Sequence, residues 1–297
     1  MLLAAEPRLI HGHILSPVRD EARFLAASLL LWLGRRDGRV VNRNERSARD
    51  CSRALGSALR TTALRRAPGE ERRWAELIEE RRAELASEHA ETQAVFTERP
   101  ERGAPRWTRI LRAGPVAEAC GVISIPPLWG VLLMRLAREL RPTVAVELGT
   151  GFGISAAYLA AGLQLNGAGC LATFDGAEKW AAIAEEGTSR LGVSRAEFRV
   201  GPLSETLETA LSELDPVGLA FIDAEHTKES TLRYFTTLLP HLSRGAVLVF
   251  DDIDFDAPMW EAWTEIREHP AVAVAVSLGK MGIVSVAPRG GEGARER

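Results

Sequence analysis

Three glycines in alternation, Gly149, Gly151 and Gly153, follow a run of β-branched and small apolar residues at 144–148. The run is typical of a strand buried on both faces, and the residues after it carry apolar side chains at helical spacing. Glycine adopts backbone conformations that a Cβ atom disfavours, and it lets a ligand lie against bare backbone. A strand, a glycine turn and a helix N-terminus in this order predict the ligand-binding corner of an open parallel sheet.

The spacing of these glycines separates two kinds of cofactor. The dinucleotide pattern G-x-G-x-x-G would need a glycine where Ile154 stands. An acid, one residue and G-x-G-x-G stand here instead, which resembles the first motif of the class I S-adenosylmethionine (SAM) methyltransferases. The resemblance implies that Glu147 helps to hold the methionine amino group. It also implies a cofactor-binding turn made of Gly149, Thr150, Gly151, Gly153 and Ser155. A tight turn without a ligand is the alternative.

Two later positions extend the same resemblance. Asp175 ends the second predicted strand, where the family binds the ribose hydroxyls of its cofactor. The alternative role for Asp175 is to cap the helix that begins near Ala177. Gly201 and Leu203 follow the third strand, at the place where the family encloses the adenine ring.

Carboxylates also end the next two strands. Asp223 follows an apolar strand and precedes His226 by three residues, and Asp251 and Asp252 end the following strand. Ligands of open α/β sheets bind at the carboxyl ends of the strands, so we expect these side chains to share one edge. Neighbouring carboxylates repel one another unless a cation or hydrogen bonds offset their charge. Oxygen clusters of this kind suit hard cations.

Asp223, Asp251 and Asp252 resemble the metal triad of the catechol-type O-methyltransferases, in which an Asn takes the place of Asp252. Those enzymes have a Lys three residues after the first Asp, whereas the sugar O-methyltransferases of macrolide pathways have a His, as here. The resemblance implies a Mg²⁺ site on the three acids, with His226 as the general base and Asp223 as a second catalytic residue that also contacts the cofactor. The alternative for His226 is a helix cap or a packed ring. Trp260 and Trp263 are candidates for a wall of the acceptor pocket, with helix packing as the alternative.

Further runs carry the resemblance across residues 74–286. They match a bacterial group of SAM-dependent methyltransferases, and they comprise E-L-G-T-G-F-G-I-S, D-A-E-H, Leu232–Phe235, V-F-D-D-I, Met259–Trp263 and Lys280–Ile283.

These residues need a sheet that brings their strand ends together. Strands are predicted at 143–148, 171–174, 197–200, 218–222, 246–250, 272–276 and 283–286, with helices between the first six. The alternation predicts a doubly wound, Rossmann-like α/β sheet of seven strands, mainly parallel. The short turn at 278–280 predicts an antiparallel terminal hairpin, which resembles the class I methyltransferase fold.

Three segments are expected along the chain. Residues 1–69 form an Arg-rich helical extension with a helix at 18–33, residues 70–120 a helical lead-in or cap, and residues 121–290 the methyltransferase domain. A charged helix is predicted at 70–97 and a loop at 98–106. The segment 35–66 holds ten Arg against three acids but no aromatic residue. This composition favours a solvated helical face over a nucleic-acid surface, which would use aromatic stacking.

The cysteine spacing and the hydropathy bear on the compartment, on a zinc site and on membrane association. The three cysteines, Cys51, Cys120 and Cys170, lie far apart, which predicts a reducing cytoplasm and no zinc site. No apolar run reaches the roughly 18–20 residues that cross a bilayer, so no membrane association is expected. The motifs and the resemblance together imply a SAM-dependent methyltransferase that methylates a hydroxyl oxygen of a small molecule, with a nitrogen acceptor as the lesser option. The alternative is a non-catalytic module that binds SAM or docks a partner, and a homodimer is left open.

Overall fold

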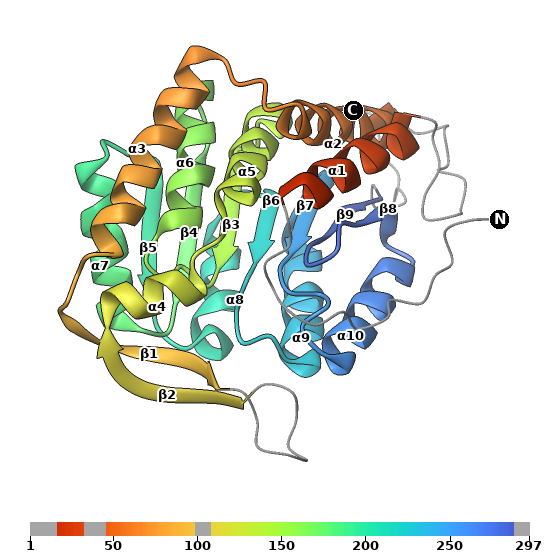
Figure 1. The fold of residues 1–297 in the computed structure, drawn as a ribbon. Coiled ribbons are helices and arrows are strands. Elements are labelled where there is room, and N and C mark those ends of the chain that lie inside the picture. The colour runs from red at the N-terminus through yellow and green to blue at the C-terminus, as the bar shows by residue number, and fades with distance from the viewer. Residues whose placement is uncertain (1–16, 33–45, 99–107, 288–297) are drawn as a thin grey trace.

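The structure, a computed structural model, describes residues 17–32, 46–98 and 108–287 (Figure 1). A seven-stranded sheet with the order β5-β4-β3-β6-β7-β9-β8 forms its centre. The strands are β3 (Val144–Leu148), β4 (Cys170–Asp175), β5 (Ala196–Val200), β6 (Val217–Ile222), β7 (Leu242–Phe250), β8 (Val272–Ser277) and β9 (Gly282–Val286). Strands β3 to β7 pair in parallel, and β9 runs antiparallel to both β7 and β8. The predicted doubly wound sheet with a terminal antiparallel hairpin is confirmed.

Helices cover both faces of this sheet (Figure 1). One face carries α1 (Pro17–Trp32), α2 (Arg46–Ala63), α5 (Pro127–Leu140), α6 (Ile154–Asn166) and α7 (Glu178–Arg190). The other carries α8 (Leu203–Glu213), α9 (Lys228–Leu238) with the short η1 (Leu239–His241), and α10 (Ala257–Glu268). Successive strand side chains point to opposite faces, so Ala145 and Leu171 pack with the first set of helices and Val146 and Ala172 with the second.

The segment before the sheet is only partly helical. Helix α3 (Gly69–Leu85) ends well before residue 97, and β1 (Glu91–Glu98) pairs antiparallel with β2 (Thr108–Pro115) ahead of α4 (Val116–Ile123). The single helix predicted over 70–97 is therefore wrong in its second half. Residues 92–97 include two threonines, a valine and a phenylalanine, which favour a strand once a partner strand is available.

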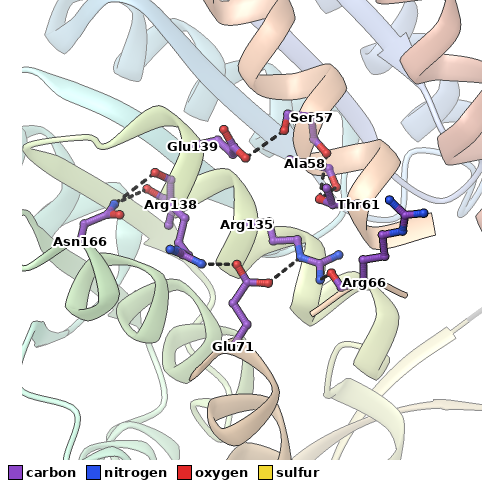
Figure 2. Close-up of polar contacts among 10 residues, drawn as sticks. Ser57, Ala58, Thr61, Arg66, Glu71, Arg135, Arg138, Glu139 and Asn166 are labelled. Carbon is purple, nitrogen blue, oxygen red and sulfur yellow. Dashed lines mark hydrogen bonds and ion pairs between the residues drawn. The ribbon is translucent and has the colours of Figure 1, made fainter. Parts of the chain in front are cut away.

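The N-terminal helices are joined to α5 by polar contacts (Figure 2). Glu71 of α3 lies between Arg135 and Arg138 of α5, with Arg135 Nε 3.0 Å from Glu71 Oε2. Ser57 of α2 donates to Glu139 Oε1 at 2.9 Å. The buried residues of α2 also belong to the same apolar core as those of α5 and α6. The N-terminal helices therefore share the core of the sheet.

Some predictions lie outside the described residues: the irregular start at 1–16, the part of the Arg-rich segment at 35–45 and most of the loop at 98–106. In the part of the chain that the structure describes, no single helix has the length and apolar character needed to cross a bilayer. The bent pair α4 and α5 reaches that limit only when both helices are counted together.

Candidate active site

A cavity of about 400 Å³ opens at the carboxyl ends of β3, β4, β6 and β7. Most of the predicted cofactor residues line it: Gly149, Thr150, Gly151, Ser155, Asp175, Leu203 and Asp223. The predicted base His226 lines it too, as do Asp251 and Asp252. Glu147, Gly153 and Gly201 are described by the structure but are not part of this lining. The strand order thus gathers residues that are more than a hundred positions apart in the sequence.

The glycine turn has the backbone that its sequence predicts. Gly149, Gly151 and Gly153 all have positive φ angles, of 98°, 53° and 81°. A Cβ atom on Gly149 would lie 2.1 Å from the carbonyl oxygen of Asp223, so any side chain there would force β3 and β6 apart. Gly151 instead lines the cavity, and a Cβ atom there would meet Ile123 Cδ1 at 3.3 Å. Gly149 is therefore required by packing, and Gly151 leaves backbone exposed to the cavity.

The Asp175 carboxylate stabilises this turn through hydrogen bonds from backbone amides. Its Oδ2 accepts a hydrogen bond from the Gly151 amide at 2.8 Å, and its Oδ1 accepts from the Ala177 amide at 2.7 Å. Burial raises the pKa of the Asp175 carboxyl, although the amides of Ala177 and Gly151 act to lower it. The bond to Ala177 precedes α7, whose N-cap is Ala177 itself, without a side-chain cap, so Asp175 is not the helix cap of the alternative. Asp175 lines the cavity, which is where a ribose-binding carboxylate is expected.

Glu147 lies beneath the turn and is fully buried. Thr173 Oγ1 donates to its Oε2 at 2.5 Å, while its Oε1 has no hydrogen-bond partner among the residues that the structure describes. Burial raises the pKa of the Glu147 carboxyl to about 8, against the opposing effect of the Ser155 and Thr173 hydroxyls. An unsatisfied buried oxygen of this kind costs free energy unless a ligand or a water supplies a donor.

The acidic edge continues the parallel strand pairing beyond the sheet. The Asp223 amide donates to the Leu148 carbonyl at 2.8 Å, and the Asp251 amide donates to the Ile222 carbonyl at 2.9 Å. Each bond ties the residue after one strand to the end of its neighbour. The side chains of Asp223, Asp251 and Asp252 are thereby brought to one end of the cavity, as predicted.

His226 sits among these acids on a strained backbone. Its Nε2 lies 3.2 Å from Asp223 Oδ1 and 3.9 Å from Asp252 Oδ2, and its ring stacks on Phe255 at a centroid distance of 6.0 Å. Glu225, His226 and Asp252 have positive φ angles of 56°, 40° and 51°. Non-glycine residues in this region cost of order 1–3 kcal/mol each and gather at functional sites. The imidazole is therefore held in place from both sides of the acidic edge.

Lys280 joins this edge, although the sequence analysis did not assign it to the site. It lies in the turn between β8 and β9, and its Nζ is 2.9 Å from Asp251 Oδ2 and 3.4 Å from Asp252 Oδ1. Burial lowers the pKa of Lys280, but the carboxylates of Asp251, Asp252 and Asp223 outweigh this and raise it. The sequence did hold one indication that Lys280 belongs to the site, because this Arg-rich chain has only three lysines.

The three acids do not fit the metal site that the resemblance implies. Asp251 and Asp252 direct one carboxylate oxygen each at the Lys280 ammonium, while Asp223 and the other oxygen of Asp252 face His226. Among the described residues, no three His, Cys, Asp or Glu side chains are grouped in a way that could hold a metal ion. The cation beside these carboxylates is a side chain of the protein.

A second cavity of about 1080 Å³ adjoins the first. The two share part of their lining, namely Val122, Ser124, Asp252, Phe255 and Lys280. Its other walls come from the N-terminal helices and from α5, and include Asp20, Thr62, Arg65, Arg72 and Trp129. A volume of this size is at the upper end of the range for drug-sized ligands.

The predicted tryptophan wall is not part of either cavity lining. Trp263 is buried in the core against Phe250, and its Nε1 donates to Ser277 Oγ at 2.9 Å. Trp260 packs at the edge of the same core with Arg267 over its ring. Both tryptophans therefore serve helix packing, which was the alternative for them.

Comparison with known proteins agrees with this geometry. A family model described as a methyltransferase domain matches residues 146–253. A catechol O-methyltransferase of Niastella koreensis is 31% identical over 161 residues, which cover 54% of this chain and 70% of the relative. A Mycolicibacterium smegmatis protein assigned as an O-methyltransferase is 33% identical over 135 residues, covering 45% of this chain and 62% of that protein.

A solved Klebsiella pneumoniae structure assigned as an O-methyltransferase shares the fold. It has a TM-score of 0.50 and 19% identity, and the match covers 77% of this chain and 94% of that one. The glycine turn, the strand order and the catechol O-methyltransferase relative point to one family. The chain belongs to the class I SAM-dependent O-methyltransferases.

Proposed function

We propose that this enzyme methylates a hydroxyl oxygen of a small molecule, with His226 as the general base. The observation that supports the proposal is the position of the His226 imidazole, which lines the first cavity and contacts Asp252 and Phe255 of the shared boundary. An acceptor bound in the second cavity would extend its reacting hydroxyl across that boundary, toward His226 and the cofactor in the first cavity. When bound, SAM supplies an electrophilic methyl group on a sulfonium centre.

The first cavity fits SAM on two features. Gly151 exposes backbone to it, and Asp175 stands at its rim on the side of β4, where the resemblance expects the ribose. The unsatisfied Oε1 of Glu147 lies below the same turn, and we assign it to the methionine ammonium, reached directly or through Ser155. Gly149 and Gly153 shape the turn, Thr150 and Leu203 line the cavity, and Gly201 supports the adenine side.

His226 would take the acceptor proton as the oxygen attacks. The contact between its Nε2 and Asp223 favours the tautomer with the hydrogen on Nε2, which makes Nδ1 the basic nitrogen. The imidazolium that results is stabilised by the carboxylates of Asp223 and Asp252. Positioning of the hydroxyl in line with the methyl group supplies much of the remaining rate.

The N-terminal segments supply walls of the second cavity, in which we place the acceptor. We propose that residues 121–290 form the catalytic domain, while the extension at 1–69 and the lead-in at 70–120 close the second cavity. Asp20, Thr62 and Arg65 of the extension line it, as do Arg72 and Gly121 of the lead-in or its boundary. A diol such as the catechol used by the Niastella enzyme's class is the first acceptor to test.

His226→Ala tests the base. Turnover should fall by roughly 10²–10⁴-fold because the proton has no positioned acceptor, while SAM affinity stays close to that of the wild type. Formation of S-adenosylhomocysteine with catechol as the probe acceptor measures the first quantity, and calorimetric titration with SAM the second. His241→Ala, remote from both cavities, is the matched control. Full turnover in His226→Ala would remove His226 from the mechanism.

A further inference from the structure

Lys280 crosses from the terminal hairpin to the acidic edge. The turn that carries it is fixed there by its own backbone, since the Ile253 amide donates to the Lys280 carbonyl at 2.8 Å. The Lys280 side chain is 19% exposed, and its ammonium lies between Asp251 and Asp252. Lys280 also lines both cavities, so its charge lies where the cofactor and acceptor sides meet.

The charges at this edge need such a cation. Asp251 is only 4% exposed, and a buried carboxylate is costly unless an opposite charge and hydrogen bonds compensate it. Asp252 and Asp223 add further negative charge nearby. Lys280 provides the compensation from a position that packing already fixes, so the edge is complete without an added ion.

We infer that the Lys280 ammonium supplies the positive charge that a divalent metal ion supplies at this edge in catechol-type enzymes, so that methyl transfer here needs no metal. This inference rests on the proposed O-methyl transfer. In it, Lys280 orients the carboxylates that hold His226, and its charge stabilises the oxygen from which the proton leaves. Lys280 is thus a positioning and charge-supplying residue, and its carboxylate partners are not metal ligands.

The first measurement uses the full-length wild-type protein, and its metal titration needs no acceptor. Titration with Mn²⁺, followed by the loss of the free-ion electron paramagnetic resonance signal, should show no stoichiometric binding at millimolar Mn²⁺. Chelator treatment should leave catechol methylation unchanged. Stoichiometric Mn²⁺ binding that Asp252→Ala abolishes, or activity lost to chelator and restored by Mg²⁺, would overturn the inference.

The second measurement removes the cation. Lys280→Met should lower turnover by roughly 10²–10³-fold, as the loss of one preorganised charge does elsewhere, and should create a Mn²⁺ site on the freed carboxylates. Lys280→Arg should retain part of the turnover. Lys228→Met is the matched control, because Lys228 pairs with Glu261 and Glu265 on the surface. Wild-type turnover in Lys280→Met, or no gain of Mn²⁺ binding in it, contradicts the inference.

A variant that fails to fold and a failure of the proposed chemistry can each be told apart from a failure of this inference. If Lys280→Met does not fold, the double variant Lys280→Met/Asp251→Asn removes the buried charge together with its partner and should restore folding with low turnover. Failure of the proposed chemistry is distinguishable, because it would appear as wild-type turnover in His226→Ala. The Mn²⁺ titration would still report on Lys280 in that case.

Discussion

Glu147→Gln should make the free enzyme more stable above neutral pH while weakening its affinity for SAM. The carboxyl is fully buried under the glycine turn, and its pKa is raised to about 8, mainly by desolvation. Glutamine has the same shape and cannot ionise. It can keep the hydrogen bond from Thr173, and its amide can donate to the Ser155 hydroxyl. The variant therefore tests the charge with little change in packing.

The magnitude follows from proton linkage. The unfolded chain loses the Glu147 proton near the ordinary glutamate pKa of 4.5, whereas the folded protein holds it up to about pH 8. This proton stabilises the folded state at low pH, and the stabilisation is lost as the pH rises toward 8. Between about pH 6 and about pH 8 the wild type should lose about 2 kcal/mol of unfolding free energy through this group. Glu147→Gln should not show this loss.

Urea denaturation of both proteins at the two pH values measures the difference, and other titrating groups cancel in the comparison. The exposed Glu208→Gln is the matched control and should follow the wild type. SAM affinity of Glu147→Gln should fall by roughly 10–100-fold, since a hydrogen bond to a charged group is worth about 1.5–3 kcal/mol. The same pH dependence in variant and wild type would show that Glu147 is ionised in the folded protein and would refute the reasoning.

Two further predictions concern the surroundings of the site. Glu71→Ala should destabilise the fold by about 3–5 kcal/mol, because it leaves the buried Arg135 guanidinium without its carboxylate. Urea denaturation checks this against the exposed Glu70→Ala, and a loss below about 1 kcal/mol would contradict it. Gly121→Phe should place a ring in the second cavity and raise the acceptor KM by roughly tenfold with SAM affinity unchanged. Steady-state kinetics with catechol checks it, and an unchanged KM would place the acceptor elsewhere.

Much of the sheet could be predicted because its strands are short apolar runs bounded by glycine, proline or acids. Parallel strands end at one edge, so Asp175, Asp223 and Asp251 could be placed there from their positions in the sequence alone. The secondary structure of the N-terminal region is less predictable from the sequence. The strand β1 depends on pairing with β2, and the local sequence around α3 carries no sign of where the helix yields to the hairpin.

The features of the site that could not be predicted from the sequence depend on tertiary packing. Lys280 reaches the acids only because the β8–β9 hairpin turns back over the end of β7, a contact between segments with no shared motif. The depth of Glu147 under the turn, and hence its raised pKa, also depends on neighbours from β4. Trp263 could not be assigned to core or pocket from helical spacing, since both uses place it on an inward face.

Calorimetric titration of SAM into Gly151→Val tests the central claim most directly, since that claim makes the glycine turn the cofactor site. Valine at a φ of 53° is strained, its Cβ would press on Ile123, and its methyl groups would enter the cavity. Affinity should fall by about 3 kcal/mol, or about 10²-fold. Gly167→Val carries similar strain, at a φ of 68°, at the far end of α6 and should bind SAM as the wild type does. Wild-type affinity in a folded Gly151→Val protein would contradict the account.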